Sequence, residues 1–225
     1  MMQTQTRFWS RLGVLGGFYA VLFVIANILL GEPGSGTAGA TVVTYYHDHQ
    51  TTETVGVFAV AFAVVALTFF LASLRRTLSA TDEGRYLANV VTAGGAVYAA
   101  GLMMMTALTV ALVDAAKNNM PGTAQTLNVL SSDMWLPVVV GLALLGLGTG
   151  VSALRSATLP KWLGWVSVAF GLLALAGPAG GIAFLVAPAW ALLIGIVIMR
   201  SSRAAATLAD SAAQDAPEQW VTGSR

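Results

Sequence analysis

The sequence predicts an all-α integral membrane protein, a bundle of six transmembrane helices, and three observations lead to this fold class. The chain is 56% hydrophobic but only 9% charged, whereas a soluble domain carries about 25% charged residues. It contains six long apolar segments, and about 20 apolar residues span the hydrocarbon core of a bilayer. These segments are continuously apolar and do not alternate in polarity, which excludes a transmembrane β-barrel.

Charged and turn-forming residues mark the ends of the spans. The second span ends at Arg75 and Arg76, the third ends before Asp114, and the fourth begins after Asp133. Only a short turn around Pro178 separates the last two spans, so we expect two short helices there. The expected spans are 13–31, 54–74, 90–113, 135–154, 162–178 and 180–199.

The basic residues predict the orientation of the bundle. With six spans, ten of the eleven Lys and Arg residues fall on one side, and only Lys117 falls on the other. The positive-inside rule places the basic side in the cytoplasm. We therefore expect a plasma-membrane protein with both termini cytoplasmic. Residues 1–12 would form the N-terminal segment. The small, polar residues 200–225 would form a disordered tail, and the alternative for the start of this tail is an extension of the sixth helix.

Pairs of small residues indicate how the helices pack. Gly13 and Gly17 are four residues apart, as are Gly146 and Gly150. This spacing lets helix backbones approach closely in lipid. We expect both pairs to pack within the bundle, and a dimerisation face is the alternative.

The ionisable residues argue against several kinds of chemistry. No Asp, Glu, Lys, Arg or His lies deep within a span, although proton-coupled transporters generally use such groups. His47 and His49 are the only histidines and lie outside the spans, which argues against a haem inside the bundle. The absence of cysteine excludes disulfides and thiolate metal sites. The sequence also lacks the basic stripe that would indicate nucleic-acid binding.

The segment TYYHDHQ, residues 44–50, is the candidate site on the extracytoplasmic face. On a helix, His47 and His49 point about 200° apart, whereas His49 and Glu53 lie one turn apart and can share a ligand. On an extended strand, His47 and His49 share a face instead. Such groups suit zinc or another divalent metal that imidazole binds. The candidate ligands are His49, Glu53, Asp48, His47 and Asp133, with Asp114 as a further carboxylate.

A second interpretation of this segment needs no metal, and we favour it. A short helix lying on the membrane and leading into the second span would place its tyrosines at headgroup level and its charged groups in water. A third interpretation is a pH-sensitive surface, because histidine titrates near neutrality. We therefore expect no cofactor, and a divalent metal on the outer face is the alternative.

Three short motifs resemble those of a bacterial family of multi-pass membrane proteins of unknown function. VVTYYHDHQTTETVG resembles that family's YY-x-DH loop, FLASLRR resembles its FL-x-x-LR helix end, and LPKWLGW resembles its LP-x-WLGW entry into a late helix. The resemblance covers most of residues 10–200. It implies an integral membrane protein without assigned catalytic residues, in which Asp48 and His49 match the loop's DH and His47 occupies its variable position.

Three classes of function agree with these features. We favour a non-enzymatic accessory or interaction protein, whose partners are the lipid bilayer and a membrane protein or a second copy, and not nucleic acid. One alternative is a small transporter for a neutral or lipidic solute, which requires a polar cavity. Its lining would include Asn27, Tyr98, Thr106 or Thr109. The other alternative is an enzyme or metal site on the outer face, which requires the candidate ligands to converge.

Overall fold

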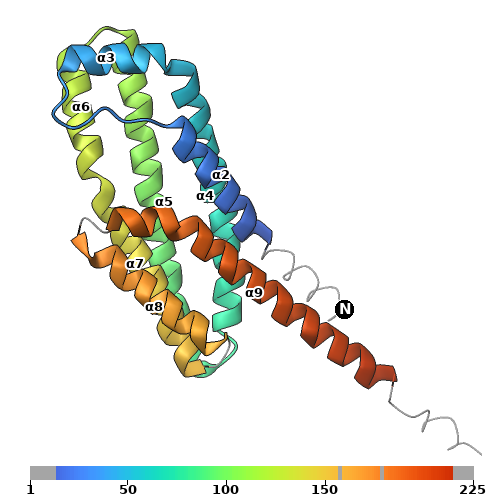
Figure 1. Cartoon of the computed structure of the whole chain (residues 1–225). Coiled ribbons are helices and arrows are strands. Elements are labelled where there is room, and N and C mark those ends of the chain that lie inside the picture. The colour runs from blue at the N-terminus through green and yellow to red at the C-terminus, as the bar shows by residue number, and fades with distance from the viewer. Residues whose placement is uncertain (1–13, 157–158, 178–179, 215–225) are drawn as a thin grey trace, which may run out of the picture.

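The computed structural model describes residues 14–156, 159–177 and 180–214, and the regular structure within these ranges is entirely helical (Figure 1). A break at Met134 separates α6 from α7. The helices are α2 (Val14–Leu29), α3 (Gly39–Asp48), α4 (Gln50–Leu78), α5 (Asp82–Lys117), α6 (Pro121–Asp133), α7 (Trp135–Ser156), α8 (Lys161–Leu175) and α9 (Gly180–Gln214).

Among the described residues, four helical stretches are long and apolar enough to cross a membrane. They are Gln50–Leu78, Asp82–Lys117, Pro121–Ser156 and Gly180–Ser201. The all-helical class and the membrane-type helices expected from the sequence are thus present. The first and fifth expected spans correspond to α2 and α8, which are apolar but have only 16 and 15 residues. Residues 13, 178 and 179 of the expected spans lie outside the described residues.

Helices α4 and α5 form a long antiparallel hairpin. Arg75 and Arg76 occupy the last turn of α4, and Asp82 lies in the first turn of α5, so each charge opposes the partial charge of its helix end. Thr81 caps α5, because its hydroxyl oxygen accepts a hydrogen bond from the Gly84 backbone N–H at 3.1 Å. This hairpin forms one side of the bundle.

Glycines let α7 approach both of its neighbours closely. A Cβ added at Gly141 would lie 2.6 Å from the Tyr98 Cα on α5. At Gly146 it would lie 2.7 Å from the Gly171 Cα on α8. The helix backbones are therefore in direct contact, as small residues allow in lipid. Gly150 also faces α8, so the second expected glycine pair packs inside the bundle.

Helix α2 lies against α4 and α9. The glycine of α2 that approaches α9 most closely is not one of the expected pair. A Cβ added at Gly16 would lie 2.9 Å from the Ala191 carbonyl oxygen on α9. Gly17 would meet only the Leu192 side chain, at 3.4 Å, and Gly13 lies outside the described residues. The close contact with α9 is therefore made by Gly16 and not by its neighbour Gly17, which belongs to the expected pair.

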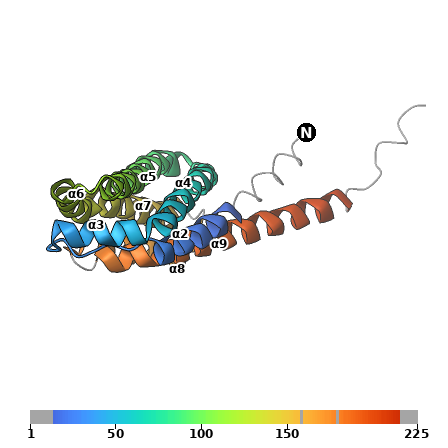
Figure 2. The same ribbon diagram turned by 90° about the horizontal axis from the view of Figure 1, so that it is seen from above.

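Helix α9 extends well beyond the bundle (Figures 1 and 2). It contains Pro188 and continues through residues 200–214, so the start of the polar tail extends the last helix, which is the alternative to disorder there. That segment is rich in alanine, the residue with the highest intrinsic helix propensity, and this explains why the helix continues. Residues 215–225 lie outside the described residues.

Candidate functional site

The candidate site lies at the end of the bundle where α4 begins and α5 ends. We call this end the cap, and it consists of α3, α6, the connection 30–38 and the adjoining ends of α4 and α5. Helix α3 runs across the ends of the long helices (Figure 1). The cap has a hydrophobic cluster of its own, and its members are Val42, Val43, Tyr46, Leu112, Val113, Ala115, Ala116 and Ala124. The segment that contains TYYHDHQ is thus a packed helix and not a free loop.

Glu53 is the central polar residue of the cap. It lies in the first turn of α4, and its side chain is wholly buried. Its Oε1 accepts one hydrogen bond from the Gly31 backbone N–H at 3.0 Å and another from the Tyr45 hydroxyl at 3.3 Å. Its Oε2 has no hydrogen-bond partner among the described residues. One carboxylate oxygen therefore fastens both the 30–38 connection and α3 to α4.

The two tyrosines of α3 remain protonated next to this carboxylate. Burial raises the pKa of the Tyr45 and Tyr46 hydroxyls above their ordinary value of 10.0, and the negative charge of Glu53 raises the pKa of both further. Tyr45 therefore keeps the proton that it donates to Glu53.

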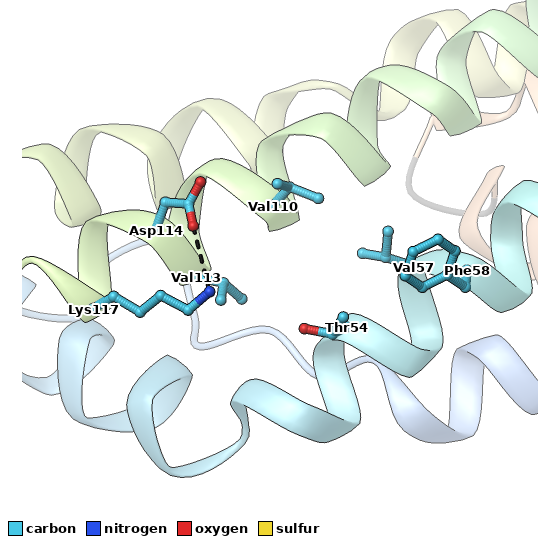
Figure 3. A pocket seen from close by; sticks show the side chains of 7 residues that line it. All are labelled: Thr54, Val57, Phe58, Val110, Val113, Asp114 and Lys117. Atoms are coloured by element: carbon cyan, nitrogen blue, oxygen red, sulfur yellow. Dashed lines mark ion pairs between the residues drawn. The ribbon is translucent and has the colours of Figure 1, made fainter.

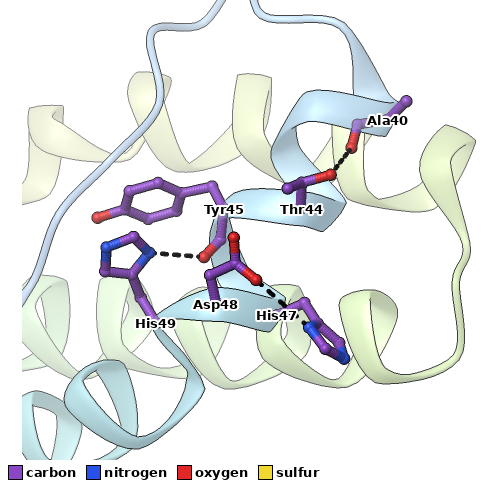
Figure 4. A network of polar contacts seen from close by, with 6 residues as sticks. All are labelled: Ala40, Thr44, Tyr45, His47, Asp48 and His49. Atoms are coloured by element: carbon purple, nitrogen blue, oxygen red, sulfur yellow. Dashed lines mark hydrogen bonds and ion pairs between the residues drawn. The ribbon is translucent and has the colours of Figure 1, made fainter.

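His49 lies at the junction of α3 and α4, and Tyr45 contacts both it and Glu53. The His49 Nδ1 is 2.8 Å from the Tyr45 carbonyl oxygen, and the two rings stack with centroids 4.4 Å apart (Figure 4). The hydroxyl of the same tyrosine reaches Glu53. One atom of each residue in the expected pair of metal ligands, the His49 Nδ1 and the Glu53 Oε1, is therefore engaged in contacts within the protein.

The His47 ring points away from Tyr45 and His49, and its printed contact is with Asp48 (Figure 4). The His47 Nδ1 lies 3.6 Å from an Asp48 carboxylate oxygen, and these side chains are 70% and 63% exposed. The two histidines thus lie apart, as the helical interpretation expects. The exposed pair presents adjacent polar groups to the surroundings of the cap.

The remaining carboxylates of the candidate set are exposed. Asp133 is the last residue of α6. An Asp114 oxygen lies 3.6 Å from the Lys117 ammonium. In the ranges that the structure describes, no three His, Asp or Glu side chains are grouped so that they could hold a metal ion. The metal interpretation therefore rests on the sequence pattern alone.

Two cap contacts were not anticipated from the sequence, and both fasten the 30–38 connection to α6. The Asn128 Nδ2 donates a hydrogen bond to the Gly34 carbonyl oxygen at 3.1 Å, and the Ser132 hydroxyl lies 3.4 Å from a Glu32 oxygen. Asn128 is wholly buried. Residues 121–133 lie between the third and fourth expected spans. The helical spacing of Ala124, Asn128 and Ser131 is the signal that could have identified a buried face there.

The polar residues proposed to line a transport cavity are bonded within the bundle. Asn27, Thr106 and Thr109 each donate to a carbonyl four residues earlier on the same helix. The Tyr98 hydroxyl lies 2.7 Å from the Tyr19 hydroxyl, and both side chains are buried. These groups stabilise α2 and α5 and satisfy their own hydrogen-bonding needs.

Comparison with protein-family models, curated proteins and solved structures finds no match to this chain. The resemblance of the YY-x-DH and LP-x-WLGW motifs therefore remains a prediction based on short sequences.

Proposed function

We propose that this chain is a non-enzymatic membrane interaction protein that presents the exposed face of α3 to a protein partner. The observation that carries this proposal is the contrast between the two faces of one short helix. Val42 and Tyr46 are buried in the cap, and Glu53 fixes α3 to α4, whereas His47 and Asp48 are largely exposed. A polar surface held at a fixed orientation suits recognition, because little conformational freedom is lost on binding.

The same proposal places the protein in the plasma membrane. The chain crosses the membrane six times, and both termini lie in the cytoplasm. Helix α2 lies antiparallel to α4, since Leu30 meets Gly56 and Gly16 meets Phe70. Helix α8 lies antiparallel to α7 in the same way. The segregation of ten basic residues from Lys117 supports this arrangement, in which the cap lies outside. The expected partner is another membrane protein or a second copy of the chain.

Site-specific photo-crosslinking tests the proposal. A photoreactive amino acid at position 47, on the exposed face of α3, should give one defined crosslinked product in native membranes. The same group at Tyr86, which is 75% exposed near the start of α5, is the matched control and should not give this product. The mass of the product distinguishes a second copy from a different protein.

Loss of the exposed polar groups is the second arm of this test. Replacing His47 and Asp48 together by alanine should remove the product formed from a photoreactive group at Thr44, which is exposed on the same helix. A folded chain that forms no product from either α3 position would contradict the proposal.

A further inference from the structure

A groove of about 230 Å³ lies between the cap ends of α4 and α5 (Figure 3). Both helices belong to the stretches that are long and apolar enough to cross a membrane. Phe58 is 60% exposed and Val110 is 45% exposed, so the groove opens on the outer surface of the bundle. The groove is lined by Thr54, Val57, Phe58, Val110, Val113, Asp114 and Lys117.

The polarity of the groove changes along its length. Asp114 and Lys117 occupy one end, and Val57 and Phe58 occupy the other (Figure 3). The charged end is the one nearest the end of α5, so it lies toward the cap, and the apolar end lies toward the middle of the bundle. This is the order in which a phospholipid of the adjoining leaflet places its headgroup and its acyl chain.

The charged end carries both signs of charge. The Lys117 ammonium and the Asp114 carboxylate are 3.6 Å apart, and their side chains are 45% and 64% exposed. This separation is longer than a strong charged hydrogen bond of about 2.8 Å, so both groups retain bonding capacity for a ligand. The Thr54 oxygen points toward the same end (Figure 3). A headgroup with one phosphate and one ammonium complements this pair of charges.

We propose that the groove binds phosphatidylethanolamine, with an acyl chain along the apolar wall, the phosphate at Lys117 and the ammonium at Asp114. A phosphate without an ammonium would leave the carboxylate facing a like charge, which costs binding energy. The site is therefore selective for a zwitterionic lipid whose ammonium has N–H groups. It is separate from the exposed face of α3 and does not depend on the partner proposed for that face.

Lipid retention by the full-length protein tests this site. The chain is purified in detergent, freed of lipid and mixed with phosphatidylethanolamine, phosphatidylcholine or phosphatidylglycerol that carry the same acyl chains. Mass spectrometry of the intact complexes measures the lipid retained. Phosphatidylethanolamine should bind about fivefold more tightly than phosphatidylglycerol, the effect of one exposed charge pair. Phosphatidylcholine, whose ammonium has no N–H, should fall between them.

Two pairs of substitutions on α5 identify the charges responsible. Asp114→Asn with Lys117→Gln removes both charges, leaves polar side chains at both positions and should remove the preference between the three lipids. The control is Asp82→Asn with Arg85→Gln, because this pair has the same i, i+3 spacing at the opposite end of the helix, at 2.9 Å. The control should keep the wild-type preference. Equal retention of all three lipids by the wild type, or an unchanged preference in the Asp114/Lys117 variant, would overturn the proposal.

A third variant tests the apolar part of the groove. Val110→Trp fills it without altering the charges and should lower retention of all three lipids, with circular dichroism showing that the chain remains helical. Wild-type retention by this folded variant would place the acyl chain elsewhere and overturn the proposal. Alanine at His47 and Asp48 should leave lipid retention unchanged, so a failure of the proposed interaction function remains distinguishable from a failure of this site.

Discussion

At the scale of single residues, Glu53 connects three segments of the cap through one oxygen atom. Its Oε1 accepts hydrogen bonds from Gly31, which follows α2, and from Tyr45 on α3. A buried donor that loses its acceptor costs about 1–3 kcal/mol, more than the hydrogen bond itself contributes. Position 53 therefore requires an acceptor, whereas these two contacts do not require a full negative charge.

We predict that Glu53→Ala lowers the free energy of unfolding by about 1–3 kcal/mol. Glu53→Gln keeps an acceptor oxygen and should remain close to the wild type. Thermal unfolding in detergent, followed by circular dichroism, measures the difference. Asp133→Ala is the control, because it removes an exposed carboxylate from the same cap. Equal stability of the two alanine variants would show that Glu53 does not hold the cap together.

We also predict that His49→Ala leaves the fold intact. The side chain is exposed and only stacks on Tyr45 and contacts its carbonyl oxygen, so the cost should be at most about 1 kcal/mol. By contrast, Tyr46→Ala removes a buried aromatic side chain and should cost about 3–5 kcal/mol. Expression level and thermal unfolding compare the two. A large loss of folded His49→Ala protein would mean that this histidine has a structural role.

At the scale of elements, the glycines of α7 determine how closely the bundle packs. Gly141 and Gly148 face α5, and Gly146 and Gly150 face α8. Residues seven apart return to the same side of a helix after about two turns. Two glycine faces on one helix therefore allow backbone contact with two neighbours. Because lipid provides no hydrophobic drive between helices, this close packing is a main source of their association.

Gly141→Ala should destabilise the bundle, because the new Cβ would meet backbone atoms of Tyr98 that cannot move independently of α5. We expect a cost of about 1–3 kcal/mol, typical of overpacking. Gly181→Ala is the matched control, since nothing lies within 4 Å of an added Cβ there, and alanine favours the helix. The thermal unfolding temperature should fall for Gly141→Ala and should rise or stay unchanged for Gly181→Ala. A neutral Gly141→Ala would contradict the close contact of α5 and α7.

At the scale of the whole molecule, two packed units share the long helices. The bundle has the larger hydrophobic cluster, and the cap has the smaller one. Helices α4 and α5 extend through both units, because they have 29 and 36 residues and exceed the length of a bilayer's hydrocarbon core. The cap is thus continuous with the bundle through α4 and α5.

Single cysteines test the proposed six crossings, since the natural chain has no cysteine. A membrane-impermeant thiol reagent applied to intact cells should label Asp48→Cys in the cap. It should label Glu83→Cys and Ser201→Cys only after permeabilisation. All three positions are exposed. Labelling of Ser201→Cys from outside would show that α8 and α9 do not both cross the membrane, and labelling of Glu83→Cys would reverse the orientation.

The amino-acid sequence alone predicts the helical membrane class and the approximate place of each apolar helix. A bilayer provides no water to hydrogen-bond backbone groups. Long continuous apolar segments therefore form helices, which satisfy these groups internally. The sequence also limited the candidate site, because its few ionisable residues are concentrated outside those segments.

Which of these residues contact one another depends on the tertiary structure. Glu53 bonds to Gly31 and Asn128 bonds to Gly34, which are 22 and 94 positions apart in the chain. Helical periodicity relates only residues a few positions apart, so it could not show that Glu53 is buried, that α6 packs on the cap, or that α4 and α5 form a groove. Those features depend on which helices become neighbours, and in lipid this choice follows from the close fit of small residues and polar contacts between them.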